Sequence, residues 1–192
     1  EIGDLIYVDV SRMNLGKIKN DVNSMWDLAV HDLAIIDYLC GGKIPLKIQT
    51  MGEKRFSSQE LLTYLTLKYD GFIAHIKSSW ISPLKERRII IAGEKKMIVF
   101  DDMKNVEKLC IYDKGLDCLG SVRNMEYHDY AVRIRTGDLF IPYIEGEDAL
   151  KNSIEAFAHS IENGSPSISD GAQALRVVGI LEAANRSLNN ED

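Results

Sequence analysis

Short apolar segments separated by tight turns fill the chain between Leu46 and Tyr143, and this pattern constrains the fold more than any other feature. The segments Leu61–Lys68 and Phe72–Trp80 flank Asp70-Gly71, a dipeptide typical of β-hairpin turns. Parallel neighbours need a crossover of a dozen or more residues, so strands joined by such short turns are expected to be antiparallel. Three further turns fit this reasoning: Gly93-Glu94 between Arg88–Ala92 and Met97–Phe100, Asp113-Lys114-Gly115 after Leu109–Tyr112, and Thr136-Gly137-Asp138 between Val132–Arg135 and Leu139–Ile144.

Helical periodicity appears on both sides of this β-rich region. Residues 3–12 alternate with period two and predict a strand, and apolar residues at helical spacing then predict a helix from about Trp26 to Cys40. Gly41-Gly42 is expected to end that helix. Near the C-terminus one apolar stripe ends at Asn163-Gly164, and a second helix begins after Ser169 or Asp170.

The order of these elements predicts the fold class. A strand, a helix, many antiparallel strands and two final helices are typical of an α+β fold, in which helices pack on one face of a large, open, mainly antiparallel β-sheet. Alternating βαβ units are missing from the sequence, and so are the Gly-x-Gly-x-x-Gly and Walker-type phosphate loops. The pattern therefore argues against a Rossmann domain within this chain.

Composition narrows the function classes. The 192 residues suffice for one domain, and the net charge of −6 argues against a nucleic-acid partner bound through a broad basic face. No apolar run reaches the roughly 18 residues that cross a membrane, so no membrane partner is expected. Three cysteines without zinc-finger spacing are typical of reduced thiols in a cytoplasmic protein, and a Cys110–Cys118 bridge stays open as an alternative.

Asp27 and His31 form the most informative pair of polar residues. They are four residues apart, so on an α-helix they share a face, where a carboxylate orients an imidazole for acid–base work. A purely structural acidic residue in a first helical turn explains Asp27 equally well. The His31-Asp32 dipeptide also suggests a metal-dependent phosphohydrolase, but the other histidines (His75, His128 and His159) lie far off, so no metal site is expected.

Several motifs occur together over nearly the whole chain. An Arg12-x-Asn14-x-Gly16 motif precedes Asn23 and the stretch Trp26-Asp27-Leu28-x-x-His31-Asp32. The others are Glu1-Ile2-Gly3-Asp4-Leu5, Ser79-Trp80, Pro83, Gly93-Glu94-Lys95-Lys96, Asp101-Asp102, Asp170-Gly171, Val177-Val178, Leu181-Glu182-Ala183-Ala184 and Ser187-Leu188. As an ensemble they resemble the C-terminal domain of the glucose-fructose oxidoreductase/inositol dehydrogenase family (Gfo/Idh/MocA).

The resemblance implies a function and assigns roles to residues. It implies the substrate-binding and oligomerisation domain of an NAD(P)-dependent oxidoreductase that acts on a sugar or nucleotide-sugar hydroxyl. His31 is then the acid–base residue and Asp27 its orienting partner, while Arg12, Asn14 and Asn23 are candidate substrate contacts. NAD or NADP is expected to bind mainly to a Rossmann domain that this chain lacks, and no cofactor-binding residue is assigned here. The family's Glu-Lys-Pro motif is also missing, so the chain alone is expected to be inactive.

The resemblance also bears on domain organisation. Residues 1–188 are expected to be one such C-terminal domain, with 189–192 as a frayed tail, and the start without Met, directly in a strand, is typical of one domain of two. The uncovered sheet face is expected to form a homodimer or homotetramer. A non-catalytic interaction or scaffold domain that keeps the fold and assembles through its sheet is the alternative.

Overall fold

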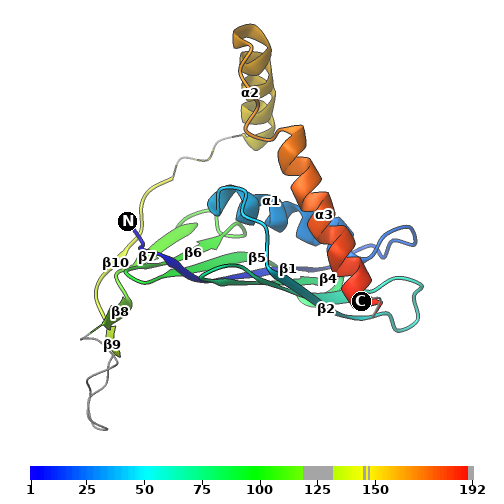
Figure 1. Cartoon of the computed structure of the whole chain (residues 1–192), viewed down its shortest axis with the longest axis horizontal. Helices are drawn as coiled ribbons and strands as arrows, with labels where there is room; N and C mark the ends of the chain where they lie inside the picture. The colour runs from blue at the N-terminus through cyan, green and yellow to red at the C-terminus, as the bar shows by residue number, and fades with distance from the viewer. Residues whose placement is uncertain (119–131, 145, 147, 190–192) are drawn as a thin grey trace.

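A single large sheet with helices above one face makes up the body of the molecule (Figure 1). The computed structural model describes residues 1–118, 132–144, 146 and 148–189. The strands are β1 (Leu5–Leu15), β2 (Lys47–Glu53), β3 (Leu62–Lys68), β4 (Ile73–Ser79), β5 (Ile81–Gly93), β6 (Met97–Asp101), β7 (Leu109–Tyr112), β8 (Gly115–Cys118), β9 (Val132–Arg135) and β10 (Leu139–Phe140). The helices are a π-helical turn, η1 (Met25–Ala29), then α1 (Val30–Leu39), α2 (Ala149–Asn163) and α3 (Gly171–Leu188).

The sheet has eight strands in the order β10-β7-β6-β5-β1-β4-β3-β2. Every neighbouring pair is antiparallel except β1 and β4, which run parallel because η1, α1 and the β2–β3 hairpin lie between them in sequence. The hairpin predicted at Asp70-Gly71 is present as β3 and β4, and Gly71 takes the positive φ of 91° that the turn requires. The predicted α+β class, with a mainly antiparallel sheet, is confirmed.

One predicted hairpin is wrong. We expected Val132–Arg135 to pair with Leu139–Ile144 across Thr136-Gly137-Asp138, but β9 pairs with β8 in a separate two-stranded sheet and β10 pairs with β7. Arg135 holds the small sheet in place, since its Nη1 donates to Asp113 at 2.7 Å. The expected turn therefore joins two different sheets. Turn residues alone do not reveal this, because they fix only the local reversal of the chain.

The core lies between the sheet and the helices α1 and α3. Val8 and Val10 of β1 point toward the helices, where they meet Leu33 of α1 and Leu181 of α3, and each of these four side chains is no more than 1% exposed. Alternation along β1 leaves Tyr7 on the opposite face, which no helix or second sheet of the described residues covers (Figure 1). The helical layer thus covers one face only, as the sequence predicted.

An ion pair joins the two covering helices. Arg176 of α3 donates from Nε and Nη2 to the two carboxylate oxygens of Asp37 on α1, both at 2.8 Å. The hydrogen bonds from Arg176 lower the pKa of Asp37, although burial of the carboxylate acts in the opposite sense. Because the Asp37 side chain is 2% exposed, this pair fixes α3 against α1.

The first helix ends as predicted and begins differently. Gly41 and Gly42 follow α1 with φ of 66° and 76°, which confirms the predicted glycine C-cap. The expected helical start near Trp26 is instead the π-helical turn η1, and the α-helix begins at Val30. The change matters because π turns are rare and occur frequently at functional sites.

Helix α2 differs from the other two in having no buried residue. It is capped by Asp148, which accepts from Leu150 N, and by Gly164 with φ of 59°, yet it extends away from the sheet (Figure 1). The apolar stripe predicted from the sequence is present and exposed, with Phe157 61% and Ile161 67% accessible. No helix in the described part of the chain is long and apolar enough to cross a membrane.

Two smaller expectations concern the chain end and the thiols. Asn189 is the C-cap of α3, and residues 190–192 of the predicted tail lie outside the described residues. Cys40 and Cys110 are free thiols, so Cys110 does not form the bridge that stayed open from the sequence.

Candidate active site

A small pocket lies where the C-terminal part of β1 meets the start of α1. Its lining includes Arg12 and Asn14 from β1, Leu28 and His31 from the helical segment, and Lys85 and Arg87 from β5. Arg12 and Arg87 are direct partners in the β1–β5 register. The structure thus brings together three of the five predicted site residues: His31, Arg12 and Asn14. His31 is exposed, as a group that exchanges protons with a ligand must be.

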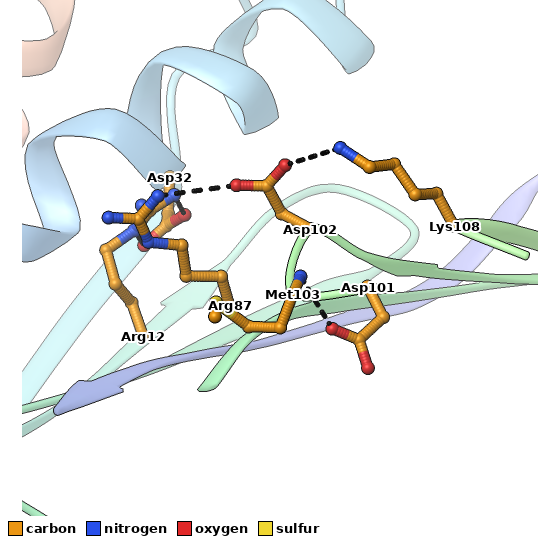
Figure 2. A network of polar contacts seen from close by, with 7 residues as sticks. All are labelled: Arg12, Asp32, Arg87, Asp101, Asp102, Met103 and Lys108. Atoms are coloured by element: carbon orange, nitrogen blue, oxygen red, sulfur yellow. Dashed lines mark hydrogen bonds and ion pairs between the residues drawn. The ribbon is translucent and has the colours of Figure 1, made fainter. Parts of the chain in front are cut away.

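Arg12 is tied to the helix that carries His31. Its Nε donates to Oδ2 of Asp32 at 2.8 Å and its Nη2 donates to Oδ1 at 2.6 Å (Figure 2). The Asp32 side chain is 1% exposed, and its hydrogen bonds raise the pKa of Arg12. This two-pronged contact fixes the start of α1 over β1. Arg12 therefore positions His31 through its neighbour Asp32, and its third nitrogen, Nη1, makes no hydrogen bond to the described residues.

Beside this pair, a second ionic network borders the pocket. Nη1 of Arg87 donates to Asp102 at 3.4 Å, and Nζ of Lys108 donates to the other oxygen of Asp102 at 3.4 Å (Figure 2). The turn that carries Asp102 is fixed by Asp101, whose carboxylate accepts from Met103 N at 3.0 Å. Arg87 and Lys108 thus share the carboxylate of Asp102 through two long contacts. The hydrogen bond that holds the Arg87 side chain is therefore weak.

Asp27 does not face His31 in this structure. Its carboxylate accepts a hydrogen bond from Nε1 of Trp80 at 2.9 Å and a further one from Nζ of Lys19. Asp27 lies in the π-helical turn and His31 in α1, so the two residues do not lie on one continuous α-helix as the sequence predicted. Asp27 instead anchors the turn before His31 to the buried Trp80.

Asn23 is also placed away from the pocket. Its side chain is buried, Nδ2 donates to Glu60 at 2.9 Å, and Oδ1 accepts from the backbone N of Trp26 at 3.1 Å. The second bond caps the start of the helical segment. Burial alone raises the pKa of Glu60, but the bonds from Asn23 and from Lys54 outweigh it, so the pKa of Glu60 is lowered overall. Both ends of the Asn23 amide are therefore occupied within the fold.

Among the lining residues that were not predicted as site residues, two are basic, namely Lys85 and Arg87. The sequence pattern around Arg87-Arg88 indicated a solvated pair at a strand end, and the predicted strand began only at Arg88. In the structure β5 begins at Ile81, and alternation turns Arg87 toward the helices while Arg88 pairs with Glu86 at 2.7 Å. The first part of β5 contains Pro83, and proline is rare inside sheets, so the sequence pattern does not indicate a strand there. Pro83 is tolerated here next to a register shift in the β1–β5 pairing.

Neither a cluster of metal ligands nor a Gly-rich phosphate turn occurs among the described residues. No cluster of three or more His, Cys, Asp or Glu side chains occurs among them, and His128 lies outside the described residues. A dinucleotide site needs a Gly-rich turn between a strand and a helix, and the sequence lacks one. Gly41 and Gly42 end a helix instead of opening one. The described residues therefore include no Gly-rich turn that would hold the pyrophosphate of a dinucleotide.

Comparisons with known proteins agree with this architecture. The model of the GFO/IDH/MocA C-terminal domain matches residues 4–99, a stretch that includes all five predicted site residues. No curated protein matches the sequence.

Among solved structures, UDP-N-acetylglucosamine 3-dehydrogenase GnnA from Acidithiobacillus ferrooxidans is similar at a TM-score of 0.75 and 21% identity, covering 98% of this chain and 55% of its own. A putative oxidoreductase from Magnetospirillum magnetotacticum MS-1 reaches 0.72 and 24%, covering 95% and 55%. An oxidoreductase from Agrobacterium radiobacter, in complex with NAD+, L-tartaric acid and magnesium, reaches 0.69 and 14%, covering 100% and 56%. This chain thus spans about half the length of the structures that it resembles.

Proposed function

Because the chain belongs to the Gfo/Idh/MocA family as its C-terminal domain, we propose that it is the substrate-binding and oligomerisation half of an NAD(P)-dependent oxidoreductase acting on a sugar or nucleotide-sugar hydroxyl. The observation that carries the proposal is the exposed His31 in one pocket with Arg12 and Asn14. A dehydrogenase acting on a UDP-sugar and an oxidoreductase holding NAD+ are among the proteins with this fold, and they support the reaction class.

The residues of this chain would hold the sugar and move its proton. The dinucleotide supplies the hydride chemistry when it is bound, and we propose that it is held by a part of the protein outside this chain. His31 takes the hydroxyl proton during oxidation and returns it during reduction. Asp27 and Arg12 position this histidine from two sides, through Trp80 and through Asp32 respectively.

The test replaces His31 in the longer polypeptide in which this chain follows a dinucleotide-binding domain. His31→Ala should lower turnover about 10²- to 10⁴-fold, the usual contribution of a general acid–base group, while NADH binding followed by fluorescence stays unchanged. His159→Ala is the matched control, since His159 is an exposed histidine on α2 outside the pocket. Unchanged turnover in His31→Ala would remove the catalytic assignment.

The alternative is a non-catalytic domain that uses the same fold for assembly. The sequence upstream of Glu1 discriminates between the two, because an enzyme needs a Gly-x-Gly-x-x-Gly strand–turn–helix there, followed by Glu-Lys-Pro. The pocket favours the enzyme, since an interaction domain has no need to place an exposed histidine beside Arg12 and Asn14.

Whether the chain is part of an enzyme or a non-catalytic domain, we propose that the uncovered sheet face joins subunits into a dimer or tetramer. Tyr7, Tyr64 and Ile73 lie on this face, and between 37% and 43% of each is exposed. A flat sheet face that carries apolar side chains is typical of a protein interface. Light scattering should give at least twice the monomer mass, and Ile73→Lys should reduce it. A monomer at high concentration would contradict the proposal.

A further inference from the structure

Hydrogen-bond donors dominate the pocket beside His31, and this bears on the chemistry of the ligand. Lys85 and Arg87 reach it from β5, Arg12 from β1, and each presents only donors. Glu86 is the carboxylate residue of the described lining, and it is already paired with Arg88 at 2.7 Å. The nearby Asp32 is likewise occupied by Arg12. A ligand in this pocket therefore meets donors whose charge is only partly balanced by protein acceptors.

Lys85 is the cation of the pocket lining that has no carboxylate partner among the described residues. Each guanidinium around the pocket has a carboxylate partner: Arg12 pairs with Asp32, Arg87 with Asp102 and Arg88 with Glu86. Lys85 has neither a hydrogen bond nor an ion pair within the described part of the chain, and its side chain is exposed. On a chain with a net charge of −6, which repels anions in general, the pocket thus carries a local positive excess.

Asn14 adds an unsatisfied amide at the same place. Its Oδ1 is buried and has no hydrogen-bond partner in the described structure, and its Nδ2 makes no hydrogen bond to the described residues. Buried polar groups in proteins are nearly always paired, but Oδ1 is an acceptor, so the partner it lacks is a donor such as a hydroxyl and not an oxyanion. The Nδ2 amide of Asn14 is the group that can donate to an oxyanion, next to the charged Lys85. That combination suits a carboxylate or phosphoryl oxygen.

We propose that this pocket binds an oxyanion carried by the sugar substrate, with Lys85 as the main counter-charge and Asn14 as a neutral donor. The oxyanion is a carboxylate on the sugar or a phosphoryl group attached to it. The position of the sugar beside His31 rests on the proposed function, whereas the anion preference rests on the lining residues. Substrates that carry a charge next to the reacting ring are therefore preferred over neutral sugars.

The test is a set of NMR titrations of the 192-residue chain, in which backbone amide shifts report binding near residues 12–14. Four probes are compared: D-glucuronate, D-glucose 1-phosphate, D-glucose and inorganic phosphate. At least one charged sugar should bind about fivefold or more tightly than D-glucose, and the better of the two identifies the oxyanion. Higher ionic strength should weaken this binding, because the pocket is open to solvent.

Variants tie the effect to the residues named. Lys85→Gln should weaken binding of the charged sugar about fivefold, the factor that corresponds to about 1 kcal/mol for an exposed charge contact, and leave D-glucose unchanged. Lys68→Gln is the matched control, an exposed lysine on β3 outside the pocket.

Three results would overturn the proposal: equal binding of charged and neutral sugars, no binding of any probe, or inorganic phosphate binding as tightly as the sugar phosphate, which indicates an adventitious ion only. The titrations measure binding and not turnover. Their result therefore does not depend on the outcome of the His31→Ala experiment.

Discussion

Replacing Arg12 by methionine should destabilise the fold more than replacing its partner Asp32 by asparagine. Methionine keeps most of the aliphatic volume but removes both hydrogen bonds to Asp32, whose side chain is 1% exposed. Breaking a buried ion pair by removing one partner costs about 3 to 5 kcal/mol, since the remaining charge has no water to replace the lost bonds. Arg12 is itself 18% exposed, so we expect the lower end, about 3 kcal/mol. That is a large fraction of the roughly 5 to 15 kcal/mol that stabilises a domain.

Variants of Asp32 provide the free energies of unfolding with which the loss in Arg12→Met is compared. Asp32→Asn should cost only about 1 to 2 kcal/mol, because the amide oxygen still accepts one bond and Arg12 can reach solvent. The double variant Arg12→Met/Asp32→Leu should be more stable than Arg12→Met alone, since it leaves no unpaired buried charge. Urea unfolding followed by circular dichroism at pH 7 measures all three free energies.

A loss below about 1 kcal/mol for Arg12→Met, or a double variant less stable than Arg12→Met alone, would refute the reasoning. Such a result would also return Arg12 to the role predicted from the sequence, that of a direct substrate contact.

Arg176→Met should cost about 2 to 3 kcal/mol at pH 7, and this cost should shrink below about pH 4. The hydrogen bonds from Arg176 lower the pKa of Asp37 from 3.8, so the stabilisation is complete above that pH and is lost as the pH falls through the lowered pKa. Urea unfolding at pH 7 and pH 3 tests this, and a cost independent of pH counts against it. Phe157→Ser on α2 should leave the free energy of unfolding within about 0.5 kcal/mol, because its side chain is 61% exposed. Leu181→Ala on α3, where the side chain is fully buried, should cost about 2 to 5 kcal/mol, and equal costs for the two would contradict the burial described here.

Local signals in the sequence predicted most of the sheet. Alternation identified β1 through Val8 and Val10, and Asp70-Gly71 identified the β3–β4 hairpin, because strand faces and tight turns depend on neighbouring residues. The parallel pairing of β1 with β4 was not predicted. It joins segments about 65 residues apart, and no local pattern encodes a distant strand partner.

For the site, the sequence predicted which residues share the pocket better than which contacts they make. His31, Arg12 and Asn14 line one pocket, and their roles in it stay a prediction. Asp27 was expected to face His31 on an α-helix, but it lies in the π-helical turn and its carboxylate accepts a hydrogen bond from Trp80. Such a turn has no known sequence signature in this segment. Asn23 has the residue type of a substrate contact, but its neighbour in space is Glu60, 37 positions further along the chain.

The central position of β1 has a consequence for how the protein folds. The strand β1 lies between β4 and β5 in the sheet. Both partners, within residues 73–93, are synthesised some 60 to 80 residues after β1. Until then β1 has two unpaired edges, and pairing over such sequence separations is slow. Arg12 and Asn14 lie on this strand, whereas Lys85 and Arg87 lie on β5. The pocket is therefore assembled only when the two strands join, so a chain arrested before β5 would contain α1 and the strands β1 to β4 but no complete pocket.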